Sequence, residues 1–262
     1  MNENVKLTLT IGWLYPQLMS TYGDRGNIMV IQKRSEWRGI KIEILNIDQT
    51  TSEQKLSTIN LLFGGGAQDR EQEIVMQDLM KKKKTIQNLI ENDLPALFVC
   101  GAPQLMGNYY EPAIGKRIEG LGIFDMYSKH AGPRQDRLIG NVVAEIYWKN
   151  LTSNPYTLNP KRLVVGFENH GGRTYLNKNV KPFAKIIKGF GNNGEDGTEG
   201  VVYKNALGTY LHGPLLPKNP QIADWLIAKA LEIKYKKQIE LKELDDSLEI
   251  KAKEAILKKA NG

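Results

Sequence analysis

Short apolar runs alternate with helix-like segments through the first half of this 262-residue chain. The apolar runs lie at residues 7–15, 40–47, 59–63 and 94–100. Between them, residues 26–39 and 74–90 show a spacing of apolar side chains that is typical of helices. Strands that alternate with helices form βαβ units, in which successive strands pair in parallel. The pattern therefore predicts an α/β fold with a mostly parallel central sheet flanked by helices.

The second half of the chain is richer in turn signals, such as the segment HAGPRQDR at residues 130–137. It predicts antiparallel strands and loops, followed by a helix near residues 220–234. The segment GFGNNG, residues 189–194, matches a dinucleotide-binding pattern, but an acidic, glycine-rich stretch follows it, which favours a turn. We expect one domain over residues 1–240 and a charged helical tail over residues 241–262 that packs on the domain or on a partner.

Composition argues against several classes of protein. The N-terminus lacks an apolar signal core and no apolar run is long enough to cross a bilayer, so we expect a cytoplasmic protein. A single cysteine excludes an internal disulfide framework and argues against a cysteine-based metal site. The formal net charge is +7, but the basic residues are scattered apart from Lys81 to Lys84 and the lysines near the C-terminus. This favours solvated helix faces over a nucleic-acid site, and a positive surface could also steer an acidic partner or an anionic substrate.

The cysteine stands at the end of an apolar run, in the segment LFVCGAPQL. Cys100 is either a small core residue or a nucleophile held at a strand end. Gly101 permits a sharp turn after the cysteine, and Pro103 suits the first turn of a helix. A nucleophile in such a strand–turn–helix elbow is exposed above the sheet, and the backbone N–H after it can face a developing oxyanion. The local sequence leaves both interpretations open.

A thiolate nucleophile normally requires an imidazole base, and the chain has three histidines. His130 lies in a polar segment with no supporting pattern, which favours an exposed loop. His170 and His212 each follow an expected strand and precede a glycine, so both could lie at the rim of one cleft. From the residues alone, either of these two is the base.

The order of these motifs resembles a known family. A glycine-rich loop (FGGGAQDREQ), the Cys-Gly elbow, GFENHGGR and GTYLHGP follow one another as in the class I glutamine amidotransferases of the cobyric acid synthase type. The segments LYPQLMSTYGDRGNI, GKRIEGLG and RLIGN look like those of the glutaminase subunits of lipid II isoglutaminyl synthases. The resemblance covers about residues 10–235 and implies a flavodoxin-like amidotransferase domain.

The resemblance implies that Cys100 is the nucleophile and that His212 is its base. It places the oxyanion hole at the loop of Gly65 and Gly66, together with the N–H of Gly101. In such a site the thiolate attacks the side-chain amide of glutamine, backbone donors receive the charge of the tetrahedral intermediate, and the histidine protonates the departing ammonia.

Two further residues are assigned to glutamine binding by the resemblance. Arg137, which precedes LIGN, corresponds to an arginine whose fork can bind the substrate α-carboxylate; the alternative is a surface arginine. Gln104 matches the glutamine that ends the family's usual Gly-Gly-aromatic-Gln turn after the cysteine. Ala102 and Pro103 depart from that turn, and the proline removes one N–H and an aromatic wall.

A third catalytic member is not evident beside the histidine. In the wider class a glutamate two residues after the histidine orients the imidazole, whereas this chain has Pro214 there. Glu168 and Asp24 are candidates within the chain, although carboxylates that cap turns are the commoner use of such residues. We expect instead that a partner subunit supplies the carboxylate.

The resemblance also implies a partner and a reaction. The chain would hydrolyse L-glutamine and pass ammonia to a Mur-ligase-like subunit, MurT, in a heterodimer. The partner would use ATP to amidate the D-glutamate α-carboxyl of lipid II to D-isoglutamine during peptidoglycan synthesis, and this chain would need no cofactor. The alternatives are the amidotransferase of a cobalamin-type pathway, and a cysteine peptidase or binding module on the same fold.

Overall fold

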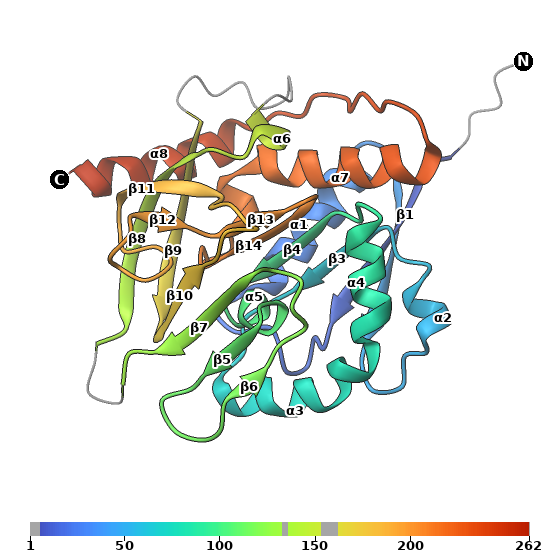
Figure 1. The fold of residues 1–262 in the computed structure, drawn as a ribbon. Helices are drawn as coiled ribbons and strands as arrows, with labels where there is room; N and C mark the ends of the chain where they lie inside the picture. The colour runs from blue at the N-terminus through green and yellow to red at the C-terminus, as the bar shows by residue number, and fades with distance from the viewer. Residues whose placement is uncertain (1–5, 133–135, 153–161, 262) are drawn as a thin grey trace, which may run out of the picture.

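A six-stranded sheet forms the centre of the computed structural model, which describes residues 6–132, 136–152 and 162–261 (Figure 1). Its strands follow the order β13 (Val201–Tyr203), β14 (Ala206–Thr209), β4 (Ala96–Val99), β3 (Leu61–Gly64), β1 (Thr8–Leu14) and β2 (Lys41–Ile47). All neighbours pair in parallel except β13 and β14, which are antiparallel. The predicted parallel sheet is therefore confirmed.

Alternate side chains of the central strands enter cores on opposite faces of the sheet. Phe63 of β3 belongs to one buried cluster and its neighbour Leu62 to the other. Every residue of β3 and β4 is buried, as expected for continuous apolar runs in a sheet that is covered on both faces. On one face, Ile31 of α1 (Arg25–Glu36) and Leu226 of α7 (Pro220–Tyr235) join the core. On the other, α3 (Asp69–Leu79) and α4 (Lys83–Glu91) cover the sheet.

The prediction of one continuous helix over residues 74–90 is wrong. The 3-10 turn η1 (Met80–Lys82) separates α3 from α4. At this break the Lys82 side chain turns inward and donates to the Asp78 carboxylate at 2.5 Å, which also accepts from the Tyr15 hydroxyl at 2.7 Å. Lys82 is only 4% exposed, so one member of the lysine run belongs to the interior and not to a solvated helix face.

Two further four-stranded sheets come from residues 109–199. One has the order β10 (Gly172–Leu176), β7 (Met126–His130), β5 (Tyr109–Glu111) and β6 (Ile118–Glu119). The other has the order β12 (Thr198–Glu199), β11 (Ala184–Lys188), β8 (Leu138–Ile146) and β9 (Leu163–His170). Their pairings are antiparallel except for β5 with β7, which confirms the expected antiparallel strands. The remaining short elements are α2 (Glu53–Leu56), α5 (Gly101–Met106), α6 (Lys149–Thr152) and η3 (Leu216–Lys218).

The C-terminal helix α8 (Ser247–Asn261) packs against the sheet that contains β8 and β9 (Figure 1). Ile256 and Leu257 contact the buried pair Val143 and Val165. Ahead of the helix, Asp246 accepts from the Arg34 guanidinium at 2.5 Å, so the segment leading to the tail is also attached to α1. The tail thus lies on the domain.

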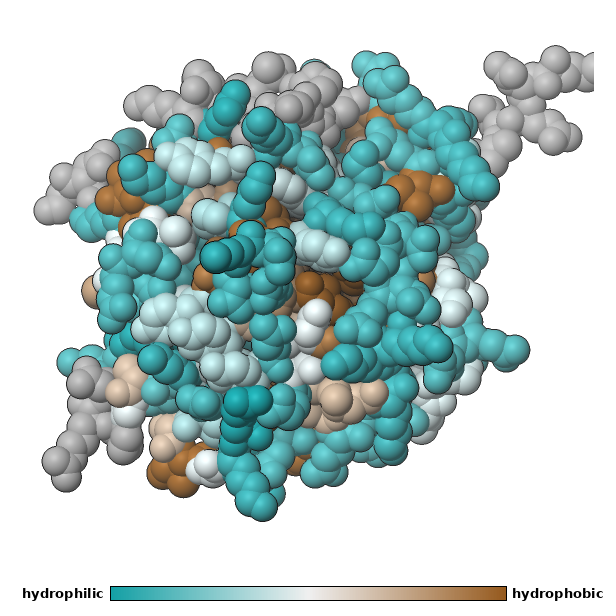
Figure 2. All heavy atoms as spheres, viewed as in Figure 1, coloured by the Kyte–Doolittle hydropathy of each residue, from teal (hydrophilic) through white to brown (hydrophobic). Residues whose placement is uncertain are grey.

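Hydrophilic side chains cover most of the face in Figure 2, and hydrophobic ones show as separate patches between them. Within the described ranges, no helix combines the length and the apolar character that crossing a membrane requires.

Candidate active site

Cys100 lies at the turn between β4 and α5. Its backbone has φ 56° and ψ −100°, a combination that is strained for a residue with a Cβ and that persists only where the surrounding structure imposes it. The Cys100 N–H donates to the carbonyl of Thr209 at 2.8 Å, which ties the elbow to the end of β14. The thiol is 8% exposed and lines a cleft of about 530 Å³. The local geometry is the strand–turn–helix elbow that the sequence predicts.

His212 is brought to the cysteine by the pairing of β14 with β4. The two strands are parallel, with Thr209 opposite Val99, so the residues that follow them emerge at the same edge of the sheet. A Cβ placed on Gly66 would lie 3.3 Å from Cys100 Cβ and 3.4 Å from His212 Cε1. Glycine at this position therefore lets a backbone loop pass beside both side chains.

The charge state of His212 is set by its neighbours. Burial by itself lowers the pKa of this histidine, but the negative charge of Cys100 and the hydrogen bond to Asp24 raise it to about 10. Nε2 has no hydrogen-bond partner in the described part of the chain by distance and angle, and Cys100 raises the pKa of His212 chiefly through its negative charge. With this pKa, His212 is an imidazolium at neutral pH.

Asp24 is the carboxylate of this chain that contacts His212, and a carboxylate from a partner subunit stays a prediction. Its Oδ1 lies 3.2 Å from His212 Nδ1, across 188 residues of sequence, and both side chains are fully buried. Asp24 precedes α1 but its side chain does not cap that helix. Tyr22 and Gly23, with positive φ values of 56° and 80°, turn the chain so that Asp24 points inward. The loops after β1, β3, β4 and β14 meet because all these strands run in parallel.

The glycine loop after β3 differs from the predicted oxyanion hole. The N–H of Gly66 donates to Asp24 Oδ2 at 2.7 Å, so it is already used to hold the carboxylate. Gly65 is required sterically, because a Cβ there would lie 2.5 Å from the carbonyl of Met19. The next N–H, that of Ala67, has no acceptor among the described residues. Its nitrogen lies 2.9 Å from the position of a Cβ on Gly101, so the backbone of Ala67 passes close to the residue that follows Cys100.

Gln104 and Arg137 both line the cleft, but each is engaged by neutral partners. Gln104 donates to the Tyr210 hydroxyl at 2.9 Å and accepts from Gln72 Nε2 at 3.0 Å, so its amide is fixed in the cleft wall. Arg137 donates from Nε to Asn169 Oδ1 and from Nη2 to the Asn169 carbonyl, both at 2.7 Å. These bonds leave Nη1 and the outer edge of the guanidinium for a ligand.

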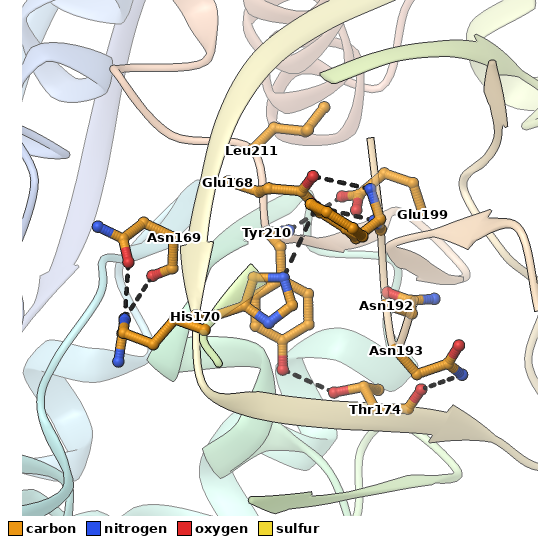
Figure 3. Close-up of polar contacts among 12 residues, drawn as sticks. Glu168, Asn169, His170, Thr174, Asn192, Asn193, Glu199, Tyr210 and Leu211 are labelled. Atoms are coloured by element: carbon orange, nitrogen blue, oxygen red, sulfur yellow. Dashed lines mark hydrogen bonds and ion pairs between the residues drawn. The ribbon is translucent and has the colours of Figure 1, made fainter. Parts of the chain in front are cut away.

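His170 also lines the cleft, and Figure 3 shows its ring beside that of Tyr210. Its ring stacks on Tyr210, with centroids 3.8 Å apart, and Nδ1 bonds to the carbonyl of Gly172 at 2.7 Å. Burial lowers its pKa, although Glu168, 3.8 Å from Nε2, opposes this. We interpret His170 as a neutral wall residue.

Glu168 has the structural role that a turn-capping carboxylate usually has. Its oxygens accept from the N–H groups of Phe190 and Gly191, both at 2.8 Å. These residues belong to the glycine-rich segment that matches the dinucleotide pattern, and that segment is a loop between β11 and β12 with no helix in it. The expected turn is confirmed.

Sequence reasoning missed several residues of the site. Tyr22 packs edge-to-face on His212, with ring centroids 5.1 Å apart, and separates the imidazole from the open cleft. His130, expected on an exposed loop, ends β7 and lines the cleft. Ala67 and Tyr22 lie within two of the segments that carry the family resemblance, but only the meeting of the loops shows that they border the site. Among the described residues, no group of three or more His, Cys, Asp or Glu side chains is arranged to hold a metal ion.

The contrast between the two histidines leads to a testable prediction. His212→Ala should slow alkylation of Cys100 by iodoacetamide at pH 7 by at least about tenfold, because the imidazolium that stabilises the thiolate is lost. His170→Ala should change the rate less, because a lowered pKa leaves that ring uncharged at this pH. Mass spectrometry on the single cysteine measures both rates, with circular dichroism as a check of folding. The reverse order would identify His170 as the partner of the thiol.

Comparison with known proteins agrees with this geometry. Residues 10–220 match the CobB/CobQ-like glutamine amidotransferase domain. The GatD subunit of the glutamine-hydrolysing lipid II isoglutaminyl synthase of Staphylococcus aureus (strain N315) is 39% identical over 97% of this chain and 96% of its own length. The corresponding subunit of Streptococcus pneumoniae (strain ATCC BAA-255 / R6) is 39% identical over 94% of this chain and 89% of its own length.

Solved structures show the same fold at much lower sequence identity. A glutamine amidotransferase from Thermotoga maritima superposes with a TM-score of 0.55 at 15% identity, covering 95% of this chain and 93% of its own. The chain therefore belongs to the CobB/CobQ-like glutamine amidotransferase family, together with the GatD subunits that it matches over nearly its whole length.

Proposed function

We propose that this chain is the glutaminase subunit of a lipid II isoglutaminyl synthase. It hydrolyses L-glutamine and supplies ammonia to a Mur-ligase-like partner, MurT, in a heterodimer. The observation that carries the proposal is the grouping of Cys100, His212 and Asp24 at one edge of the parallel sheet. The two GatD relatives, whose names state a glutamine-hydrolysing activity and lipid II, support the substrates.

The first half of the reaction forms a thioester. The Cys100 thiolate attacks the side-chain carbonyl carbon of glutamine, and the charge on its oxygen is received by the N–H groups of Ala67 and Gly101. His212, as imidazolium, donates its Nε2 proton to the leaving nitrogen, and the C–N bond breaks to release ammonia. Asp24 holds the imidazole through Nδ1. A γ-glutamyl thioester on Cys100 is left.

The second half returns the enzyme to its starting state. Neutral His212 takes a proton from a water molecule, which attacks the thioester carbonyl. The oxyanion is stabilised by the same backbone donors, and the C–S bond breaks to give glutamate and the thiolate. Every proton that His212 donates in the first half is regained here, so the cycle needs no group beyond the protein and water.

Substrate binding would use the free edge of Arg137. The guanidinium is held by Asn169 and lines the cleft that contains Cys100, so its outer edge is presented to a ligand there. A carboxylate is the group that such a fork binds best. Arg137 is therefore proposed as the residue that binds the α-carboxylate of glutamine, with Gln104 shaping the wall beside it.

The acceptor reaction belongs to the partner. We place ATP use and activation of the lipid II D-glutamate α-carboxyl in MurT, and D-isoglutamine formation in the cytoplasm, where ATP is available. The sequence of this chain contains no G-x-x-x-x-G-K-[ST] phosphate loop, which is consistent with this division.

The test of the proposed function is a glutaminase assay with and without the partner. We expect ammonia and glutamate to be released in equal amounts from L-glutamine, and we expect a Mur-ligase-like subunit to co-purify from the native cell. Ammonia release should stop when the single cysteine is alkylated. A lack of thiol-dependent ammonia release in the presence of the co-purified subunit would contradict the proposal and favour a binding module, whereas hydrolysis of peptides would favour a peptidase.

A further inference from the structure

The cleft that contains Cys100 is lined by charged side chains of both signs, and among its described lining residues Asp69 is the only carboxylate. Asp69 Oδ1 accepts from the Tyr110 hydroxyl at 2.9 Å. Neither Asp69 nor Arg137 takes part in an ion pair within the described ranges. The cleft thus presents one carboxylate, Asp69, and two arginines, Arg70 and Arg137, and both Asp69 and Arg137 are held by neutral partners.

Asp69 is close to the reacting end of the cleft. It is the first residue of α3, two positions after Ala67 in the loop that supplies the oxyanion donor. Tyr110 lies close enough to feel the charges of both Asp69 and the nucleophile. Burial raises the pKa of this tyrosine well above its ordinary value, and the charges of Asp69 and Cys100 raise that pKa further. The ring also borders Gly172, because a Cβ there would lie 3.6 Å from Tyr110 Cε2. Asp69 and Cys100 therefore influence one buried side chain in the same wall.

We propose that Asp69 binds the α-ammonium group of the substrate glutamine and so selects an α-amino acid over a simple amide. This rests on the proposed glutaminase function. Around its α-carbon, glutamine carries one positive and one negative group, and the cleft offers Asp69 for the first and Arg137 for the second. The Tyr110 hydroxyl occupies one carboxylate oxygen and orients the side chain, and the other oxygen accepts the ammonium protons.

A purely structural role for Asp69 makes a different prediction. An acidic residue in the first turn of a helix is favoured by the helix dipole, and a tyrosine hydrogen bond adds to its stabilising effect. If this were its whole role, a substitution would change the free energy of unfolding and would affect all amide substrates equally. Substrate discrimination separates the two roles.

The variant Asp69→Asn tests the proposal because it removes the charge but keeps an oxygen for the Tyr110 hydroxyl. We expect KM for L-glutamine to rise about 10- to 100-fold, with kcat changed by less than about threefold. The kcat/KM for glutaramate, the analogue of glutamine without the α-amino group, should stay at the wild-type value. The preference of the enzyme for glutamine over glutaramate should therefore fall by the same factor as kcat/KM for glutamine.

Glu73→Gln is the matched control. Glu73 lies one turn further along α3, is exposed, and borders a neighbouring hollow instead of the cleft with Cys100. The same loss of one negative charge there should leave the preference for glutamine unchanged. An equal fall for glutamine and glutaramate in Asp69→Asn, or an unchanged preference, would overturn the proposal.

Binding measurements keep this test separate from the proposed function. In Cys100→Ala, which cannot turn over, calorimetry should show L-glutamine binding that weakens about 10- to 100-fold when Asp69→Asn is added. Unchanged affinity would overturn the role of Asp69 alone. Absence of L-glutamine binding even with wild-type Asp69 would overturn both the role of Asp69 and the proposed function.

Discussion

Cys100→Ala should abolish glutamine-dependent amidation by the assembled complex and leave ammonia-dependent amidation intact. Removing the nucleophile of a catalytic set typically costs a factor on the order of 10⁴ or more in turnover. Only the generation of ammonia uses the thiolate, so free ammonium salt should restore the product at the wild-type rate. Alanine keeps the Cβ, so the strained backbone at φ 56° is not relieved by the change.

Both activities are measured on the same preparation, with the free energy of unfolding compared between variant and wild type. An equal loss of the two activities in a folded, assembled complex would show that Cys100 acts at the subunit contact and not in ammonia generation. Lys33→Ala serves as a neutral control, because that side chain is exposed on α1 and forms only a surface ion pair with Glu36.

Asp24→Asn should lower kcat for glutamine hydrolysis by a factor on the order of 10² to 10⁴, with a small change in KM. The carboxylate accepts two hydrogen bonds, from the Gly66 N–H and from His212 Nδ1. An asparagine that still accepts from Gly66 turns its NH₂ group toward the imidazole. His212 must then expose a lone pair at Nδ1 and carry its proton on Nε2, which is the wrong tautomer for a base.

The pH dependence should change in a defined direction. The Asp24 hydrogen bond and charge help to raise the pKa of His212 to about 10, so their removal lowers it. The imidazolium is present below this pKa and is lost as pH rises through it, so in Asp24→Asn the protonated form is lost at a lower pH. The rate of Cys100 alkylation as a function of pH measures this shift.

Glu168→Gln is the comparison for Asp24→Asn, since it also neutralises a fully buried carboxylate. Glu168 accepts from the N–H groups of Phe190 and Gly191 and holds a loop, so its loss should act on stability more than on kcat. If Asp24→Asn retained wild-type turnover, in the isolated chain and with the partner, the orienting group would lie elsewhere. The next experiment would then be to substitute candidate carboxylate residues of the partner.

Much of the fold could be predicted because its signals are local. The strands β1 to β4 and the helices α1 and α7 follow from apolar periodicity, which the buried sheet imposes on neighbouring residues. The elbow at Cys100 was also readable, since a strand end, Gly101 and Pro103 lie within a few residues. The break between α3 and α4 was missed, and the inward contact of Lys82 with the buried Asp78 is also one that the lysine-rich stretch does not reveal.

The site residues divide in the same way. Cys100, and His170 and His212 as the alternative bases, could be chosen because each residue type is rare and each follows a strand. The local sequence did not distinguish His170 from His212 as the base, and the family resemblance favoured His212. Asp24 was underrated because an aspartate before a helix is usually a cap, and nothing local shows that its side chain faces the sheet edge instead.

The sequence by itself determined the parallel α/β architecture and indicated a strand–turn–helix elbow at Cys100, since both depend on side chains that are neighbours along the chain. Only the tertiary structure decided which distant groups serve that elbow. Parallel pairing of β1, β3, β4 and β14 brings their carboxyl ends to one edge, so loops separated by up to 188 residues meet there. Where these loops meet, the Gly66 N–H donates to Asp24, and the Ala67 nitrogen lies close to Gly101, the residue after Cys100. Hydrogen-bond partners of this kind are set by three-dimensional packing, and no spacing along the chain encodes them.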